Sequence, residues 1–165
     1  MKAVAWGYVT RDNGNGKEVL VTERYKEDDP LRSGQLAIPG GKLGPSEWYH
    51  QAAIREVLEE TGIETELEDS GKFNSVNPGH FNNANVSGVV AGKRLRLVYR
   101  DSKKSYFGEI YDLKPRNPLK DPESREGSDA KNPRYMALSE MLKRRGEFTP
   151  ACQVLVDIIK EAELL

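Results

Sequence analysis

Alternating hydrophobic and polar residues predict strands in the first part of the chain. Residues 3–9 and 18–22 are rich in Val and aromatic side chains, which favour extended backbone. Between them, the Asn- and Gly-rich run 12–16 predicts a hairpin turn, because Asn and Gly tolerate positive φ. A short apolar stretch at 36–38 is expected to end in a tight turn at 39–41.

The pattern then changes to helical spacing. A helix is predicted from Ser46 to Thr61, with Gly62 as its C-cap. One face of this helix carries the residues that we expect to pack into a core, namely Ile54, Val57, Leu58 and Thr61.

Strands and short helices are predicted for the second half of the chain. The expected strands are 64–68, 72–76, 86–90, 94–100, 105–113 and 134–138. A short helix at 139–144 is followed by a last helix, for which Thr149 supplies the N-cap and Pro150 the first residue. Residues 114–133 contain four prolines and many charges, which predicts a long mobile loop. Strands mixed with two or three helices predict one layered domain, 1–165, of the α+β or α/β class.

Composition narrows the class of protein. Lys plus Arg (25) nearly balances Asp plus Glu (26), so the net charge of −1 gives no reason to expect a nucleic-acid or membrane-surface binder. No stretch reaches the ~18–20 apolar residues that span a bilayer, and the N-terminus does not fit a signal peptide. We therefore expect a cytoplasmic protein. Its single cysteine, Cys152, lies in an apolar context that predicts a buried helical residue.

Three glutamates on the predicted helix carry the candidate chemistry. Glu56, Glu59 and Glu60 are spaced i, i+3 and i+4, so they share one helix face. Like charges at this spacing destabilise a helix unless a cation offsets them, and carboxylate oxygens are ligands that Mg²⁺ prefers. The alternative is a solvated acidic face with Arg55 as counter-ion.

The surrounding spacing favours the metal site. The sequence from 41 to 63, GKLGPSEWYHQAAIREVLEETGI, resembles the Nudix box, G-x5-E-x7-R-E-U-x-E-E-x-G-U, in which U is a bulky aliphatic residue. Every specified position of that pattern is filled, by Gly41, Glu47, Arg55, Glu56, Val57, Glu59, Glu60, Gly62 and Ile63. The preceding hairpin is also similar to that family.

This resemblance implies an α/β/α sandwich with a mixed sheet and hydrolysis of a phosphoanhydride bond. It further implies that Glu56, Glu59 and Glu60 bind divalent cations, with the Gly40 carbonyl completing the site. Mg²⁺ is the expected cofactor and Mn²⁺ its alternative. The resemblance also implies that Arg55 pairs with Glu47 or another box glutamate and orients the carboxylates.

The general base is left open between a box glutamate and an acid of the downstream loop. Glu123, Glu126 and Asp129 are the candidates in that loop, and we favour Glu126. Each of them also fits a solvated charge in a flexible segment. Lys42, next to the expected metal loop, either contacts a phosphate or is simply exposed.

One feature bears on the substrate. Pro78 lies 15 residues beyond Ile63, in the run 77–80, Asn-Pro-Gly-His. A proline at that distance is similar to the ADP-ribose pyrophosphatase branch, although an ordinary Pro-Gly turn explains it equally well. His80 and Phe81 are then candidates for a base pocket.

Three other aromatic residues are alternatives for the base pocket, although core packing also explains them. They are Trp6, Tyr8 and Trp48. His50 is expected to be structural. The runs 93–96 and 143–145 are expected to be an exposed strand face and the end of a helix, so neither predicts a nucleic-acid partner.

We therefore predict a pyrophosphohydrolase for a nucleoside diphosphate linked to another moiety, with ADP-ribose as the first guess. The alternatives are a (deoxy)nucleoside triphosphate pyrophosphohydrolase and a non-catalytic nucleotide-sensing domain. The chain begins almost at its first predicted strand, which resembles the compact triphosphate hydrolases. Its expected partner is a small nucleotide substrate, and we expect no membrane partner. Whether the protein forms a homodimer is left open.

Overall fold

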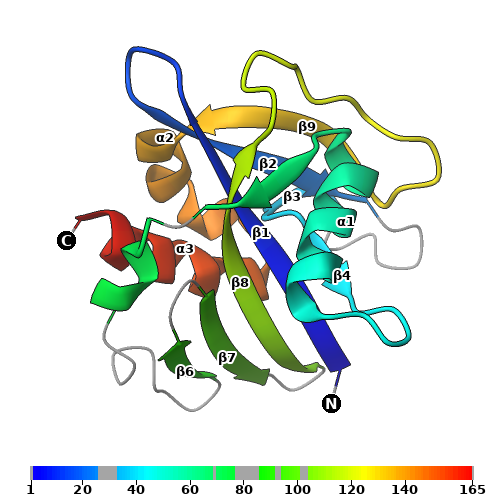
Figure 1. Ribbon diagram of the computed structural model, residues 1–165, viewed down its shortest axis with the longest axis vertical. Helices are drawn as coiled ribbons and strands as arrows, with labels where there is room; N and C mark the ends of the chain where they lie inside the picture. The colour runs from blue at the N-terminus through cyan, green and yellow to red at the C-terminus, as the bar shows by residue number, and fades with distance from the viewer. Residues whose placement is uncertain are drawn as a thin grey trace.

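The computed structural model describes residues 2–25, 33–68, 70–76, 86–91, 94–100 and 104–164. Within these residues the chain forms strands, three α-helices and two 3₁₀ helices (Figure 1). In chain order they are β1 (Lys2–Asp12), β2 (Lys17–Arg24), β3 (Gln35–Ala37), β4 (Gly40–Lys42), α1 (Tyr49–Thr61), β5 (Thr65–Leu67), η2 (Lys72–Ser75), β6 (Val86–Ala91), β7 (Arg94–Arg100), β8 (Ser105–Pro115), β9 (Ala130–Ala137), α2 (Leu138–Lys143), η3 (Arg145–Glu147) and α3 (Pro150–Leu164).

Strand β1 is the centre of the sheet. Its N-terminal part pairs antiparallel with β4 and parallel with β8, whereas Thr10–Asp12 pair antiparallel with β2. The main strand order is β3-β2-β1-β8-β7-β6, with β9 beside β2 and β5 beside β8. The predicted hairpin between β1 and β2 is confirmed, and the Asp12 carboxylate accepts a hydrogen bond from the Gly14 N–H in its turn.

Helices α1 and α3 pack on opposite faces of this mixed sheet (Figure 1). Successive residues of a strand point to opposite faces, so β1 contributes to both cores. Ala5 packs with Val57 of α1, and Tyr8 packs with Ile158 of α3. This arrangement confirms the expected α+β fold with a sheet between helices.

A glycine allows α1 to approach the sheet closely. A Cβ atom on Gly7 of β1 would lie 2.6 Å from Val57 Cγ2 and 2.8 Å from Leu113 Cδ1. No side chain fits there, because interior packing leaves no such free volume. The helix that carries the glutamates is therefore fixed against the central strand.

The start of α1 differs from the prediction. The helix begins at Tyr49 rather than Ser46, because Ser46 has φ of 59°, in the left-handed region, and cannot continue a right-handed helix. The Gln51 side chain accepts a hydrogen bond from the Trp48 N–H at 2.9 Å and closes the first turn. The helix ends at Thr61 and is capped by Gly62 with φ of 74°, as predicted.

The strand predicted at 72–76 was wrong. This segment forms the 3₁₀ helix η2, entered through Gly71 with φ of 68°. Its two apolar residues, Phe73 and Val76, are spaced i and i+3 and are both buried. That spacing fits a turn of helix and not the alternation of a strand.

The turn predicted at 39–41 was also wrong in part. Gly40 begins strand β4, which pairs with β1 through Val4 and Lys42 at one end and Trp6 and Gly40 at the other. The lack of side chains at Gly40 and Gly41 is compatible with pairing next to a crowded helix. This short strand brings the backbone of the box loop to the sheet.

The irregular segment predicted at 114–133 is shorter in the structure. Strand β8 continues to Pro115 and β9 begins at Ala130, which leaves 116–129. Pro133 lies inside β9, where the pairing register with β2 shifts between Val21 and Glu23. Proline has no N–H to donate, so it is tolerated at such a bulge.

A charged network attaches α3 to the sheet. The Glu163 carboxylate is 2.7 Å from Lys17 Nζ and 2.9 Å from Lys72 Nζ, and it accepts a hydrogen bond from the Tyr8 hydroxyl. Lys72 also lies 3.4 Å from Asp112 of β8. We call the four charged residues, Lys17, Lys72, Asp112 and Glu163, the α3 cluster.

The predicted position of Cys152 is confirmed. It lies in α3 and is buried, and its Sγ accepts a hydrogen bond from the Ile38 N–H at 3.4 Å. Among the described residues, no helix combines the length and the apolar character needed to cross a bilayer.

Candidate active site

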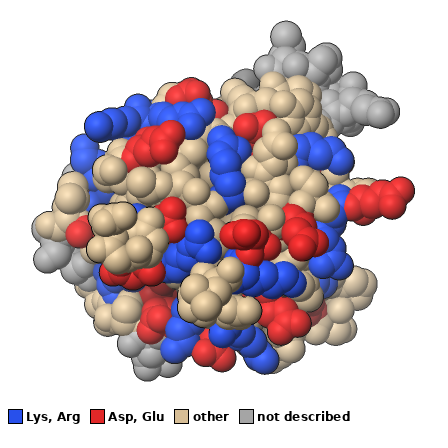
Figure 2. Space-filling view, turned by 90° about the horizontal axis from the view of Figure 1, so that it is seen from above, with Lys and Arg blue, Asp and Glu red and all other residues tan. Residues whose placement is uncertain are grey.

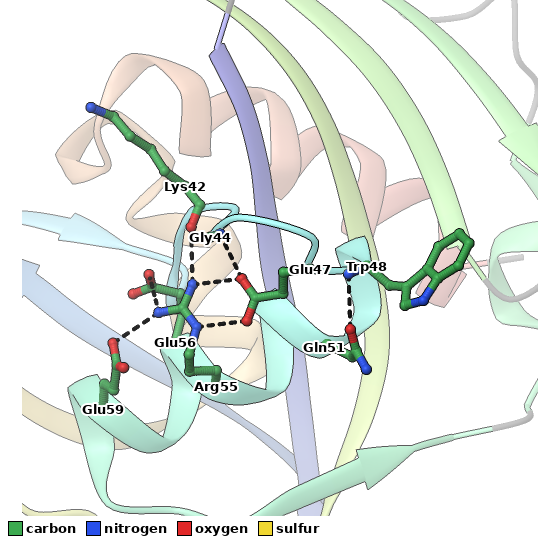
Figure 3. A network of polar contacts seen from close by, with 8 residues as sticks. All are labelled: Lys42, Gly44, Glu47, Trp48, Gln51, Arg55, Glu56 and Glu59. Carbon is green, nitrogen blue, oxygen red and sulfur yellow. Dashed lines mark hydrogen bonds and ion pairs between the residues drawn. The ribbon is translucent and has the colours of Figure 1, made fainter.

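Arg55 is the centre of a polar network on α1 (Figure 3). Its Nε and Nη2 donate to the two carboxylate oxygens of Glu47 at 2.8 and 2.9 Å. Its Nη1 donates to Glu56 at 2.9 Å and to Glu59 at 3.1 Å, and Nη2 also reaches the Lys42 carbonyl at 3.0 Å. The expected Arg55–Glu47 pair is therefore present, and one guanidinium holds three carboxylates in place.

Glu47 is the anchor of this network. Its carboxylate accepts a hydrogen bond from the Gly44 N–H at 2.8 Å in addition to the two from Arg55. The Arg55 hydrogen bonds, followed by that of Gly44, lower the pKa of Glu47 to about 2. The residue is therefore ionised at neutral pH and pairs with Arg55 rather than with a ligand.

Glu60 has the opposite environment. Burial and the neighbouring charge of Glu56 raise its pKa to about 8, with smaller contributions from Glu59 and Asp129. The Gly40 N–H donates to its Oε2 at 3.2 Å and offsets part of this effect. Burial also raises the pKa of Glu56, although Arg55 opposes it. Burial and the neighbouring carboxylates thus disfavour the charged form of Glu60, and a cation bound beside it would favour that form.

The glycine at the start of the box makes room for one of these carboxylates. A Cβ atom on Gly41 would lie 2.5 Å from the carboxyl carbon of Glu56 and 2.6 Å from its Oε1. The carboxylate therefore rests directly against the backbone of β4. A side chain at position 41 would displace Glu56 from the glutamate group.

The donor set fits a divalent cation. Glu56 and Glu59 each give one oxygen to Arg55, and Glu60 gives one to Gly40, so each carboxylate keeps a second oxygen. Among the described residues there is no group of three or more Asp, Glu, His or Cys side chains that could hold a metal ion by itself. Mg²⁺ does not require such a group, because it commonly keeps several waters and binds one or two carboxylates plus substrate phosphates.

The glutamates line a cavity of about 690 Å³ between the sheet, α1 and the start of α3. This volume falls in the range of small-molecule sites, about 300–1,000 Å³. Its wall combines acidic, basic and aromatic side chains. The acids are Glu56, Glu59, Glu60, Glu126 and Asp129, and the bases are Lys2, Arg24, Lys42, Lys104 and Arg125.

The three acidic residues of the loop differ in their position relative to the cavity. Glu126 and Asp129 line the cavity, whereas Glu123 is not among the described residues that form its wall. Instead, the Glu123 N–H donates to the Thr61 carbonyl at 2.8 Å, and the Glu123 Cβ lies about 4.0 Å from a Cβ placed on Gly62. The loop is therefore attached to the C-terminal end of α1, which brings Glu126 to the glutamates.

Two basic side chains that line the cavity, Lys42 and Arg24, have different surroundings. The Lys42 side chain points away from the Arg55 network (Figure 3), and it lines the cavity. The Nε of Arg24 is buried, and no acceptor among the described residues reaches it. A buried donor without an acceptor is costly, so Arg24 is a candidate for an anionic ligand that the sequence did not single out.

The aromatic candidates separate into core, surface and cavity. Tyr8 is fully buried in the core and Trp48 is 70% exposed, whereas Trp6 lines the cavity. His50 makes an edge contact with the ring of Tyr111, in line with a structural role. Three further candidates, Pro78, His80 and Phe81, lie outside the described residues.

On the face of the molecule seen from above, Lys and Arg side chains are interspersed with Asp and Glu (Figure 2). In β7, Leu95 and Leu97 are buried and Arg96 is exposed, so the predicted alternation is confirmed for these residues. Arg144 and Arg145 form ion pairs with neighbouring acids.

Comparison with known families agrees with the box. The sequence matches the family described as the NUDIX domain over residues 1–152. The chain belongs to this family.

Solved structures of other Nudix proteins have the same fold. The Ap4A hydrolase of C. elegans, in a binary complex, has a TM-score of 0.63 at 17% identity, covering 97% of this chain and 96% of that one. The NUDIX domain of Shewanella oneidensis NrtR, complexed with ADP ribose, has a TM-score of 0.65 at 12% identity, covering 100% and 89%. A MutT protein from Methanosarcina mazei Go1 has a TM-score of 0.61 at 20% identity, covering 99% and 93%. Family membership, with hydrolases among these neighbours, supports a Nudix hydrolase acting on phosphoanhydride bonds.

Proposed function

We propose that this Nudix protein is an Mg²⁺-dependent pyrophosphohydrolase for a nucleoside diphosphate linked to another moiety, with ADP-ribose as the first substrate to test. One observation carries the proposal. Glu56, Glu59 and Glu60 line one cavity, and each keeps an oxygen that no described residue engages. That arrangement favours a divalent cation with an anionic substrate over a purely structural helix.

The cations of the cavity support a polyphosphate substrate. Arg24 has a buried Nε without an acceptor among the described residues, and Lys42 and Arg125 line the same wall as the glutamates. A polyphosphate could contact the metal ion through one phosphate and these basic side chains through another. The ADP ribose bound to one structural neighbour and the Ap4A named for another are both nucleotides with phosphoanhydride bonds.

The reaction breaks one phosphorus–oxygen bond and forms another. A water oxygen bonds to one phosphorus of the diphosphate, and the bridging oxygen leaves with the other phosphate. We assign Glu126 as the base that takes the proton of this water, because it lines the cavity on a loop attached to α1. From ADP-ribose the products are AMP and ribose 5-phosphate.

The box residues prepare this step. Glu56, Glu59 and Glu60 would hold Mg²⁺, or Mn²⁺ in its place, with the Gly40 carbonyl as a further ligand. When bound, the metal supplies charge neutralisation of the diphosphate and a more acidic water. Arg55 positions the carboxylates of Glu56 and Glu59 and also pairs with Glu47. Pro78, His80 and Phe81 stay predicted contacts of the substrate.

A substrate panel tests the proposal. ADP-ribose, nucleoside diphosphate sugars, dinucleoside polyphosphates and (deoxy)nucleoside triphosphates are each incubated with the protein and Mg²⁺, with matched reactions in EDTA, and products are resolved by ion-exchange chromatography. We expect AMP and ribose 5-phosphate from ADP-ribose, and no product in EDTA.

Other outcomes select the other hypotheses. Nucleoside monophosphate plus pyrophosphate from triphosphates alone would replace the proposal by a triphosphate pyrophosphohydrolase. Nucleotide binding without turnover on any substrate would favour a sensing domain. Turnover that persists unchanged in EDTA would contradict the metal assignment of the three glutamates.

A further inference from the structure

Three of the side chains that line the cavity are aromatic. Trp6 of β1, Tyr106 of β8 and Tyr99 of β7 line the cavity from neighbouring strands. Tyr99 and Tyr106 are direct cross-strand partners, and their rings are stacked with centroids 5.9 Å apart and an interplanar angle of 24°. We call these three residues the aromatic floor.

Two glycines make room for the indole of this floor. A Cβ atom on Gly108 of β8 would lie 2.2 Å from Cζ3 and 2.7 Å from Cη2 of Trp6. A Cβ atom on Gly40 of β4 would lie 2.6 Å from Cδ1 of the same ring. The indole is therefore set into the sheet between two positions without side chains, and it is 7% exposed while still bordering the cavity.

The chemistry of the aromatic floor differs from that of the three glutamates. The floor offers flat, polarisable surfaces, and two lysines, Lys2 and Lys104, line the same cavity. Lys2 pairs directly with Tyr106 across β1 and β8, which places a cation beside the floor. Flat aromatic side chains with neighbouring cations are the surfaces on which nucleobases stack.

We propose that the aromatic floor is the nucleobase subsite of this protein and that Gly108 sets the depth at which Trp6 lies. The inference rests on the proposed function, because the same cavity contains the glutamates. It deepens that function by naming the residues that contact the base of the substrate. It also assigns base recognition to Trp6, Tyr99 and Tyr106 rather than to Trp48, whose ring is largely exposed.

Binding of AMP and of ribose 5-phosphate tests the subsite without turnover. The chain has two tryptophans, Trp6 and Trp48, so the Trp48→Phe variant leaves Trp6 as the only tryptophan reporter. In EDTA, we expect AMP to quench Trp6 fluorescence and to bind more tightly than ribose 5-phosphate, which lacks only the base. Equal affinity for the two compounds would overturn the proposal.

A pair of variants separates stacking from folding. In the Trp48→Phe background, Tyr106→Leu removes the ring and is expected to weaken AMP binding about 10-fold, the size expected when a stacked aromatic is lost. Tyr106→Phe keeps the ring and should bind AMP nearly as the parent does. Equal AMP affinity in the Leu and Phe variants would contradict the floor, and circular dichroism checks that both fold.

The depth of the floor is tested by adding one methyl group. Gly108→Ala should push the indole into the cavity and raise KM for the nucleotide substrate with a smaller change in kcat. Gly146→Ala is the matched control, because its Cβ would meet nothing within 4 Å. An unchanged KM in a folded Gly108→Ala protein would count against the proposed depth.

Failure of this inference can be told apart from failure of the proposed function. AMP binding on Trp6 without hydrolysis of any panel substrate would sink the proposed function and leave the floor. Hydrolysis with the same KM in Tyr106→Leu and in the parent would sink the floor and leave the proposed function.

Discussion

Two clusters of charged residues in this protein differ in the balance of acidic and basic side chains. The box cluster contains four acids and one base, namely Glu47, Arg55, Glu56, Glu59 and Glu60. The α3 cluster contains two acids and two bases. The first therefore has a charge excess beside a cavity, whereas the second is neutral as a group and joins α3 to the sheet.

The comparison teaches that charge balance, and not charge density, separates a candidate site from a structural network. Buried charges are costly unless they are paired. Glu163 is paired by Lys17 and Lys72, so nothing further is needed there. Among the described residues, the Gly40 N–H donates to Glu60, and the neighbouring carboxylates of Glu56 and Glu59 repel its charge, so an additional cation would lower the energy of the group.

The largest expected effect comes from Glu60→Gln. Turnover of the substrate found in the panel should fall by ~10²–10³-fold, the loss typical of a removed charge-stabilising group. The folded protein should be no less stable, because Gln cannot ionise and burial, followed by the charge of Glu56, disfavours the ionised form of Glu60. Steady-state kinetics and thermal unfolding measure the two quantities.

Glu64→Gln is the control, since this exposed residue lies just beyond the box. Its kcat should equal that of the parent. Wild-type turnover in a well-folded Glu60→Gln protein would refute the metal assignment.

Substitutions in the α3 cluster should lower the free energy of unfolding and leave turnover unchanged. Lys72→Met removes a cation whose side chain is 12% exposed and leaves Asp112 and Glu163 less compensated. Removing one partner of a buried pair costs about 3–5 kcal/mol, and partial exposure reduces the expected loss here to roughly 2–3 kcal/mol. Urea denaturation measures it, with kcat expected to be unchanged.

Lys114→Met provides the matched comparison, because Lys114 and Glu66 form an exposed pair at 3.7 Å. Such a pair contributes only about 0–1 kcal/mol. Equal stability losses in the two lysine variants would remove the distinction between the networks.

A smaller catalytic effect is expected in the loop. Glu126→Gln should lower kcat by roughly 10- to 100-fold, at or below the usual contribution of a general base, because box carboxylates can accept part of the role. Glu123→Gln should change kcat little, since Glu123 contributes its backbone N–H to Thr61. If both variants kept the kcat of the parent, the general base would have to be a box glutamate on α1.

The smallest effect concerns pH. Burial raises the pKa of Glu163, but hydrogen bonds from Lys17 and Lys72 outweigh it, so the pKa lies below its ordinary value of 4.5. A lowered carboxylate pKa stabilises the folded state above the unfolded pKa, and this gain is lost as pH falls through the folded pKa.

The wild type should therefore exceed Glu163→Gln in unfolding free energy near neutral pH, and the difference should shrink below about pH 4.5. Urea denaturation of both proteins across this range checks the prediction. A difference that stays constant into acid would show that packing, and not ionisation, explains the role of Glu163.

Local patterns in the sequence predicted the parts of the site that depend on neighbours in the chain. The shared face of Glu56, Glu59 and Glu60 follows from helical spacing alone. The turn between β1 and β2 follows from Asn and Gly. The start of α1 was missed, because helical spacing gives no sign of the left-handed backbone at Ser46.

The rest of the site depends on long-range pairing. Tyr99 and Tyr106 meet because β7 and β8 form a register that places them opposite each other, and Lys2 joins them through the parallel pairing of β1 with β8. Nothing in the local sequence around any of these residues specifies that register. The buried Nε of Arg24 likewise becomes visible only when its surroundings are known.

The hydrogen bond from Glu123 to Thr61 has a consequence for how such a protein can diversify. Because the loop is fixed to the last turn of α1, the helix and the loop form a reaction unit whose parts keep their relative positions. The strand residues Tyr99 and Tyr106 lie on different elements and can vary without moving that unit. Under the proposed function and base subsite, the preferred substrate would change with strand side chains, one or two at a time, while the residues of the box and the loop stay in place.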